Sequence, residues 1–145
     1  MVRVNRKRYG DILTRIGFDL VGTLLVVQGR SPSVFRTAEP RYEIINILKK
    51  EIELGTDIYI ISARVGTVQT LKEARSALNR YGIPDTVPLL MQPYWNGVES
   101  AVQFKTGMIK LLGIDKYYGD SERIDATACK NAGIKFVSVG GDRYG

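Results

Sequence analysis

The sequence predicts an α/β protein in which a parallel sheet is covered by helices on both faces. Five short apolar runs have the length of buried strands, and segments with helical periodicity separate them along the chain. Strands that alternate with helices are typical of parallel sheets in layered α/β folds. At 145 residues, with 44% hydrophobic and 25% charged residues, the chain is expected to form one globular domain.

The strands are expected at residues 16–20, 58–62, 89–91, 116–119 and 134–139. Right-handed crossovers would bring the carboxyl ends of these strands to one edge of the sheet. Ligands of open α/β sheets bind at that edge. Side chains at the strand ends are therefore the first candidates for a functional site.

Four segments between or after the strands have helical patterns. PRYEIINILKKEIELG places isoleucine and leucine on one face, with Pro40 expected in its first turn and Gly55 at its end. TVQTLKEARSALNRYGIP has the same spacing of apolar residues and ends at Gly82. KTGMIKLLG and SERIDATACKNAG are expected to be shorter helices that stop at Gly113 and Gly133.

Two stretches lack a regular pattern. LLVVQGRSPSVFR follows the first strand and is expected to form a small hairpin or flap. MQPYWNGVESAVQ follows the third strand and is expected to be irregular. Its Tyr94 and Trp95 could stack on an unpaired nucleotide, but we favour an anchor packed within the loop.

Composition excludes several classes of protein. The single cysteine, Cys129, excludes a disulfide framework and a cysteine-rich zinc site, and we expect it in the core. The chain has no histidine, so proton transfer would have to use carboxylates, lysine, tyrosine or water. No apolar run approaches the ~20 residues of a membrane span, and the N-terminus lacks the apolar core of a signal peptide. We therefore expect a cytoplasmic protein without a membrane partner.

The net charge of +6 is concentrated near the N-terminus. Residues 1–15 contain five arginines and lysines against one aspartate, which leaves only +2 for the other 130 residues. We expect a basic arm at residues 1–14 ahead of a globular domain at residues 15–145. Such an arm can bind nucleic-acid phosphates, but a solvated terminus without a partner is equally compatible with the pattern.

Polar residues follow the predicted strands at the edge where their carboxyl ends meet. They are Asp19, Ser62 and Asp120 at strand ends, with Lys105 and Asp125 in the helices that follow. Carboxylates suit Mg²⁺, and a lysine and a hydroxyl can bind the oxygens of a phosphoryl group. An aspartate beside a metal ion can also attack phosphorus and form an aspartyl-phosphate.

Four short motifs contain these residues in a characteristic order. They are Asp19-Leu20-Val21-Gly22-Thr23 after an apolar strand, Ser62 in IYIISAR, Lys105 in VQFKTGMIKLLG, and Asp120 with Asp125 in YYGDSERID. From about residue 15 to residue 139 the chain resembles the haloacid dehalogenase-like (HAD) superfamily of phosphohydrolases. The resemblance implies a three-layer α/β/α Rossmann-like HAD fold with a five-stranded parallel sheet and no large cap domain.

The resemblance also implies a Mg²⁺ site. Asp19 would be both the nucleophile and a metal ligand, and Asp120 a second ligand. The main-chain carbonyl of Val21 would be a third ligand, which any side chain at that position permits. Asp125 would orient metal-bound water or Lys105.

The phosphoryl group of the substrate would be held by the remaining motif residues. Thr23 and Ser62 would donate hydrogen bonds to its oxygens, and Lys105 would neutralise charge in the transition state. Gly22, and Ala63 beside Ser62, would let backbone N–H groups approach the phosphate.

Val21 departs from the superfamily pattern. In HAD phosphatases the residue two after the nucleophile is usually an acid, which protonates the leaving oxygen and then activates water. Acid–base help is typically worth ~10²–10⁴ in rate, so an enzyme with Val21 is expected to be slow. The residues leave three explanations open: a phosphohydrolase whose leaving group needs no proton, a phosphate- or nucleic-acid-binding module without turnover, or cleavage of carbon–halogen or carbon–phosphorus bonds. The last is ranked lowest because the segment after the first motif and the segment between Ser62 and Lys105 are too short for the helical cap that such enzymes usually have.

A site without a cap favours a large substrate such as a nucleotide or a nucleic-acid end. The segment from Ser62 to Gln92 resembles polynucleotide 3′-phosphatases in its Arg64, its Gly82-Ile83-Pro84 turn and its Leu90-Met91 strand. Gln92 stands where that group tends to have an arginine. Arg64 and Arg123 are expected to be surface residues and not substrate ligands.

Overall fold

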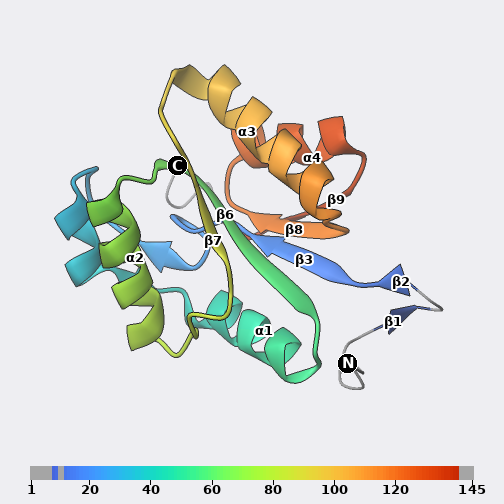
Figure 1. Cartoon of the computed structure of the whole chain (residues 1–145), viewed down its shortest axis with the longest axis horizontal. Coiled ribbons are helices and arrows are strands. Elements are labelled where there is room, and N and C mark those ends of the chain that lie inside the picture. The colour runs from blue at the N-terminus through green and yellow to red at the C-terminus, as the bar shows by residue number, and fades with distance from the viewer. Residues whose placement is uncertain (1–7, 10–11, 141–145) are drawn as a thin grey trace.

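The computed structural model describes residues 8–9 and 12–140 and has three layers (Figure 1). Its central sheet has five parallel strands in the order β7-β6-β3-β8-β9. The strands are β3 (Arg15–Phe18), β6 (Asp57–Val65), β7 (Leu89–Gln92), β8 (Lys116–Gly119) and β9 (Lys135–Ser138). The predicted α/β class and the five predicted strands are confirmed.

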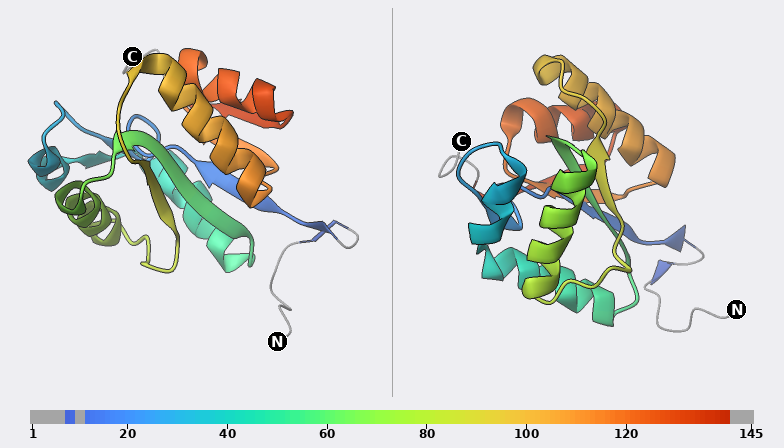
Figure 2. Two further views of the ribbon diagram at one scale, coloured as in Figure 1. Left: turned by 45° about the horizontal axis from the view of Figure 1, so that its top comes forward. Right: turned by 60° about the vertical axis from the view of Figure 1, so that its left-hand side comes forward.

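The helices cover the two faces of this sheet. Figure 2 shows α1 (Tyr42–Glu53) and α2 (Val68–Arg80) on one side, and α3 (Gly97–Leu112) and α4 (Thr127–Ala132) on the other. Alternate side chains of β6 point to opposite faces, as a strand requires. Ile58 and Ile60 join the core under α1 and α2, and Ile61 joins the core under α3 and α4. Cys129 is fully buried in the second core, as expected.

Two short antiparallel strand pairs and a 3-10 helix, η1, lie outside the main sheet. β1 (Arg8–Tyr9) pairs with β2 (Ile12–Leu13) in an antiparallel hairpin. β4 (Leu25–Val26) pairs with β5 (Glu39–Pro40), and η1 (Pro32–Thr37) lies between them, so the expected hairpin after the first motif is confirmed. Most of the predicted basic arm, residues 1–7 and 10–11, lies outside the described residues, and its binding to nucleic acid stays a prediction.

None of the helices in the described ranges has the length and apolarity that crossing a membrane requires.

Two predicted helix starts are wrong. Pro40 pairs with Leu25 in the small sheet, and the backbone N–H of Arg41 donates to the carbonyl of Leu24, so α1 begins only at Tyr42. The pairing with β4 therefore overrides the local preference of proline for a first helical turn. The helix α3 begins at Gly97, in a stretch expected to be irregular. Ala101 lies on the buried face of its first half, and the polar residues around it hide this periodicity in the sequence.

The strands β3 and β8 fit closely because β3 has a glycine at its centre. A Cβ atom on Gly17 would lie 2.6 Å from Cδ1 of Tyr117, which is fully buried. On the other face Phe18 stacks on Tyr118 with the ring centroids 4.7 Å apart. Both strands lead directly into the residues of the candidate site, so this packing sets the distance between their carboxyl ends.

Gly17→Ala is predicted to lower the free energy of unfolding by about 1–3 kcal/mol, because the methyl group overpacks a site that has no free space. Gly107→Ala is the matched control: this residue lies on the exposed side of α3 with no atom within 4 Å of the added Cβ. Alanine there should stabilise the protein by about 0.5–1 kcal/mol. Urea unfolding of both variants measures the difference, and equal stabilities would contradict the close packing of β3 on β8.

Candidate active site

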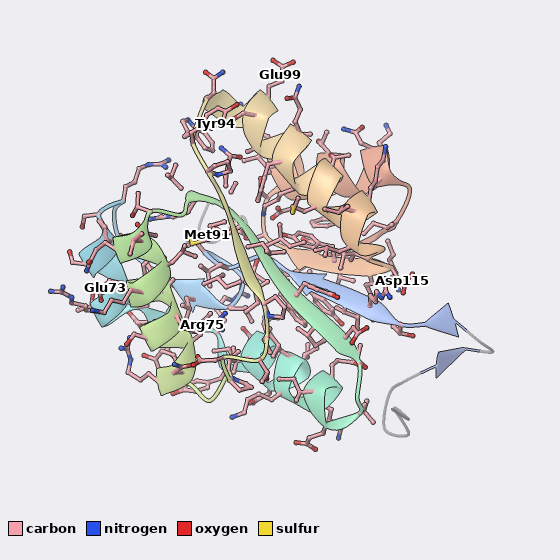
Figure 3. The ribbon with its side chains drawn as sticks, in the orientation of Figure 1. Glu73, Arg75, Met91, Tyr94, Glu99 and Asp115 are labelled. Carbon is pink, nitrogen blue, oxygen red and sulfur yellow. The ribbon has the colours of Figure 1, made fainter. Side chains whose placement is uncertain are left out.

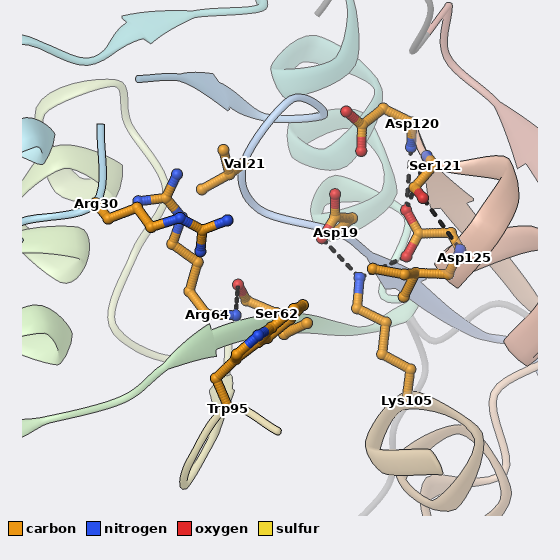
Figure 4. Close-up of a pocket in the computed structure, with 12 residues that line it drawn as sticks. Asp19, Val21, Arg30, Ser62, Arg64, Trp95, Lys105, Asp120, Ser121 and Asp125 are labelled. Carbon is orange, nitrogen blue, oxygen red and sulfur yellow. Dashed lines mark hydrogen bonds and ion pairs between the residues drawn. The ribbon is translucent and has the colours of Figure 1, made fainter. Parts of the chain in front are cut away.

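A pocket of about 180 Å³ opens at the carboxyl edge of the sheet (Figure 4). Asp19 lies just after β3, the central strand, and Asp120 lies just after its neighbour β8. Ser62 comes from β6, Lys105 from α3, and Asp125 from η2 (Glu122–Ala126). All five line the pocket, so the structure brings together residues that the sequence places up to 106 positions apart (from 19 to 125).

Lys105 is the centre of a buried ionic network. Its Nζ lies 2.8 Å from Oδ1 of Asp19 and 2.5 Å from Oδ1 of Asp125. Only 2% of its surface is exposed, so both ion pairs are shielded from water. The aromatic ring of Tyr117 lies beneath the ammonium group, with 5.2 Å between Nζ and the ring centroid. A charged group at this depth needs such partners, because an isolated buried ion is very costly.

The local conformation after β8 places Asp125 against the chain that carries Asp120. Its Oδ2 accepts hydrogen bonds at 3.2 Å from the backbone N–H groups of Asp120 and Ser121. The hydroxyl of Ser121 caps the next turn by accepting from the N–H of Ile124, and η2 is a single π-helical turn, a form frequent at functional sites. Gly119 leaves the space that Asp125 occupies, since a Cβ there would lie 2.7 Å from Cγ of Asp125.

The turn after Asp19 is equally constrained. The N–H of Asp19 donates to the carbonyl of Tyr118, which ties the turn to β8. Gly22 has a φ of +87°, and any Cβ at this position would clash with the carboxylate of Asp120. The guanidinium of Arg41, which is buried, donates to the carbonyl of Gly22 at 2.9 Å. Glycine is therefore required here both for the backbone conformation and for the approach of the second aspartate.

The three carboxylates fit a divalent cation. Asp19, Asp120 and Asp125 each offer an oxygen, and these oxygens lie within 4.8 Å of one another. Within the described residues, Lys105 is the cation that forms ion pairs with this cluster, which leaves negative charge in excess. An all-oxygen donor set suits Mg²⁺. Asp125 accepts three hydrogen bonds, one from Lys105 and two from backbone N–H groups, whereas Asp19 accepts two, from Lys105 and Thr23. Asp19 and Asp120 are therefore the better placed ligands.

Burial and like charges raise the pKa values of these acids. Desolvation is the main cause at Asp19, and it brings the pKa to about 6, with Lys105 opposing the shift and Asp120 adding to it. Desolvation, reinforced by the charge of Asp19, also raises the pKa of Asp125 to about 6. At Asp120 desolvation raises the pKa as well. Burial alone would lower the pKa of Lys105, but the charges of Asp125 and Asp19 override it and keep the ammonium protonated.

The other predicted site residues either line the pocket or are buried against Asp19. Ser62, Ala63 and Val21 line the pocket, and the hydroxyl of Ser62 accepts a hydrogen bond from the N–H of Arg64. Thr23 is fully buried, and its hydroxyl donates to Oδ2 of Asp19 at 3.2 Å. In this arrangement Thr23 orients Asp19, and its predicted contact with a phosphoryl oxygen stays a prediction.

The sequence interpretation missed part of the pocket. Arg64, expected to be a surface residue, is half-buried and lines the pocket together with Arg30, which belongs to no sequence motif. Trp95 is 43% exposed and lines the same pocket, and Tyr94 is 65% exposed at the open end of the β7–α3 loop (Figure 3), so the expected packed anchor is wrong. Arg30 lies on a flap and Trp95 on a loop, and neither belongs to a periodic pattern in the sequence. Only the folded structure shows that both line the pocket.

Known structures share this architecture. A chain in the structure of the Pnkp1/Rnl/Hen1 RNA repair complex is similar to this chain, with a TM-score of 0.70, 17% identity and 92% of this chain covered. A second structure of a Pnkp1/Rnl/Hen1 complex gives a TM-score of 0.70, also at 17% identity, over 87% of this chain. The HAD family enzyme bt-2542 from Bacteroides thetaiotaomicron, solved as a magnesium complex, is similar with a TM-score of 0.56 and 14% identity, over 87% of this chain and 92% of that enzyme. The chain has the HAD fold.

The comparisons differ in how much of each protein they cover. This chain spans 45% of the length of the matched chains in both Pnkp1/Rnl/Hen1 structures. No protein-family profile matches the sequence, and no curated protein matches it. At these identities the likeness shows the HAD fold alone, and the chemistry of the site must be argued from its own residues.

Asp120→Asn is predicted to raise the melting temperature in EDTA by about 2–4 °C, the change that ~1 kcal/mol produces in a domain of this size. The substitution removes a negative charge from a crowded acidic cluster and adds an amide that can donate to Asp19. The same variant should lose the rise in melting temperature that Mg²⁺ gives the wild type. Glu53→Gln, on the exposed end of α1, is the charge-matched control and should keep that rise. A variant that responds to Mg²⁺ like the wild type would exclude Asp120 as a ligand.

Stabilisation by Mg²⁺ is predicted to be larger at pH 7.5 than at pH 5. Asp19 and Asp125, with pKa values of about 6, hold protons at the lower pH, and a cation must displace them. In the metal-free protein these groups bind protons more tightly when folded, so their contribution to stability falls as the pH rises from about 4 to about 6. Thermal melts with and without Mg²⁺ across this range measure both trends. A stabilisation independent of pH would mean that the ion binds elsewhere.

Proposed function

We propose that this protein is a Mg²⁺-dependent phosphohydrolase that acts through an aspartyl-phosphate on Asp19. The observation that supports the proposal most directly is the buried contact of Asp19 with Lys105, within reach of Asp120. In this arrangement Asp19 would be the nucleophile, Lys105 a fixed positive charge and Asp120 a second metal ligand around one small pocket. The HAD fold and the likeness to an enzyme solved with magnesium agree with it.

The residues supply each requirement of phosphoryl transfer. A carboxylate oxygen of Asp19 would attack phosphorus as the bond to the leaving oxygen breaks, and water would then release phosphate from Asp19. Lys105 remains protonated and would offset the charge that builds up on the phosphoryl oxygens. Ser62 lies on the opposite side of the pocket, where its hydroxyl can donate to one of these oxygens.

The metal would add a second source of positive charge. Asp19 and Asp120, with the backbone carbonyl of Val21, would hold Mg²⁺, which polarises the phosphoryl group. Asp125 would act by fixing both Lys105 and the backbone at Asp120. Asp125 is thus assigned a positioning role.

Val21 supports a second candidate function, a phosphate- or nucleic-acid-binding module without turnover. Its side chain lines the pocket and can neither donate nor accept a proton. The likeness to a chain of an RNA repair complex makes a nucleotide or a nucleic-acid end a reasonable substrate or ligand for either function. Formation of the aspartyl-phosphate distinguishes the two, because a binding module has no use for it.

Asp19→Asn is predicted to lower the turnover of para-nitrophenyl phosphate with Mg²⁺ by about 10³-fold or more, because it removes the nucleophile. Asp85→Asn, in an exposed turn remote from the pocket, is the control and should retain full activity. Acid quenching of the wild type followed by mass spectrometry should find a phosphoryl group on the peptide that contains Asp19. Absence of both turnover and this adduct would favour the binding module.

A further inference from the structure

Two arginines form the side of the pocket that faces away from the acidic cluster. Arg30 lies on the flap between β4 and η1, and Arg64 lies near the end of β6. The guanidinium of Arg64 donates to the carbonyl of Gly29 at 2.8 Å, which fixes it beside Arg30. In Figure 4 the two guanidinium groups lie close together next to Val21.

Within the part of the chain that the structure describes, Arg30 and Arg64 lack the carboxylate partners that Arg36 and Arg75 have. Arg36 pairs with Glu73 and Arg75 with Asp85, whereas no ion pair among the described residues joins Arg30 or Arg64 to a carboxylate. Partial burial, with repulsion from Arg30, lowers the pKa of Arg64. Two adjacent cations that repel each other are suited to binding an anionic group between them.

The acidic side of the pocket already has the groups that the proposed phosphoryl transfer needs. Asp19, Lys105 and Asp120 provide the nucleophile and the groups that stabilise a phosphoryl group in transfer. The leaving group would then face the other wall of the pocket, where Val21, Arg30 and Arg64 lie. None of these three can act as a general acid, because valine has no proton to give and arginine holds its proton at any physiological pH.

We propose that the substrate is a phosphoanhydride, and that Arg30 and Arg64 bind the phosphate that leaves. This inference rests on the proposed phosphohydrolase activity and names its substrate class. A departing phosphate is weakly basic and needs no proton, unlike the alkoxide that leaves an alkyl phosphate ester. Fixed positive charge then replaces the acid that Val21 cannot provide.

The reaction balances without an acid on the leaving group. With hydrogen pyrophosphate, an oxygen of Asp19 bonds to phosphorus while the bridging P–O bond breaks, and the bridging oxygen departs with the electron pair as HPO₄²⁻. Water then attacks the aspartyl-phosphate, the P–O bond to Asp19 breaks, and H₂PO₄⁻ leaves. The carboxylate of Asp19 is itself a weakly basic leaving group, so this step needs no acid either.

The pocket continues into a second hollow of about 580 Å³, which shares Arg30, Ala63, Arg64 and Trp95 with it. The guanidinium carbon of Arg30 lies 5.8 Å from the centroid of the Trp95 ring. The remainder of a longer anhydride would lie in this hollow. Phosphoanhydrides come from two sources, inorganic polyphosphate and nucleoside polyphosphates, and only the latter has a base that could stack on Trp95.

The test compares kcat/KM for tripolyphosphate, a nucleoside triphosphate and glycerol 3-phosphate, an alkyl ester, all with Mg²⁺. The wild type should prefer the anhydrides by about 10²-fold or more, the usual value of a missing general acid. Arg30→Gln and Arg64→Gln should each lower kcat/KM for the anhydrides by about 10²-fold and for para-nitrophenyl phosphate by at most about 10-fold. Arg36→Gln, which removes an exposed arginine, should change neither.

Val21→Asp gives an independent readout. It should raise kcat/KM for glycerol 3-phosphate by about 10²-fold and change that for tripolyphosphate little, whereas Val21→Asn, polar without a proton to transfer, should raise neither. Trp95→Ala distinguishes the two sources: a loss confined to the nucleoside triphosphate supports the nucleoside source, and no loss supports the inorganic one.

The outcomes separate this inference from the proposed function. Equal losses on all substrates in Arg30→Gln and Arg64→Gln, or a wild-type preference for the alkyl ester, would overturn the phosphoanhydride assignment while an adduct on Asp19 still supported the phosphohydrolase. Absence of the adduct and of phosphate release from every substrate would overturn both.

Discussion

The structure of the site depends on one buried ammonium group between two aspartates. Lys105 reaches the sheet edge from α3, bonds Asp19 at the end of β3, and bonds Asp125 in η2. It thereby connects three segments that are far apart in the sequence and lie on different layers of the fold. Breaking a buried pair typically costs about 3–5 kcal/mol, since it leaves a charge without compensation. This network therefore fixes the positions of the reactive groups before any ligand binds.

The close packing of β3 on its neighbour β8 makes this network possible. Gly17, Gly22 and Gly119 each stand where an added Cβ would collide with a side chain. At Gly22 and Gly119 that side chain is an acidic residue of the site itself. The acids are buried and held near one another, and desolvation, with their mutual repulsion added, raises the pKa values of Asp19 and Asp125 to about 6. A divalent cation bound between these carboxylates would offset their mutual repulsion.

Much of this arrangement was predictable from the sequence, because it depends on periodicity and on order along the chain. The five strands and the polar residues at their ends follow from apolar runs and from the rule that parallel strands end at one edge. The start of α3 did not follow, since its first turns are polar outside and Ala101 gives a weak apolar signal. Arg30 did not follow either, as it meets the pocket only through the folded flap. For Trp95 the sequence allowed a stacking role, but it favoured a packed anchor, because no pattern shows on which side of its loop the ring lies.

The division of the pocket into an acidic side and an arginine side gives Val21 a place in the chemistry. In the proposed reaction Asp19, Asp120 and Lys105 would hold and transfer a phosphoryl group, and the side that would receive the leaving group has charge but no acid. A leaving group that is already a stable anion suits such a pocket. The departure from the usual HAD motif thus agrees with the composition of the wall around it.

The central claim is that Asp19 and Asp120 share one cation beside a nucleophilic oxygen of Asp19. A crystal structure with Mg²⁺ and BeF₃⁻, a mimic of the phosphoryl group, tests it most directly. The result expected is beryllium bonded to a carboxylate oxygen of Asp19, with Lys105 at its fluorides and an ion between Asp19 and Asp120. Beryllium fluoride bound elsewhere, or no ion shared by those two aspartates, would contradict the claim.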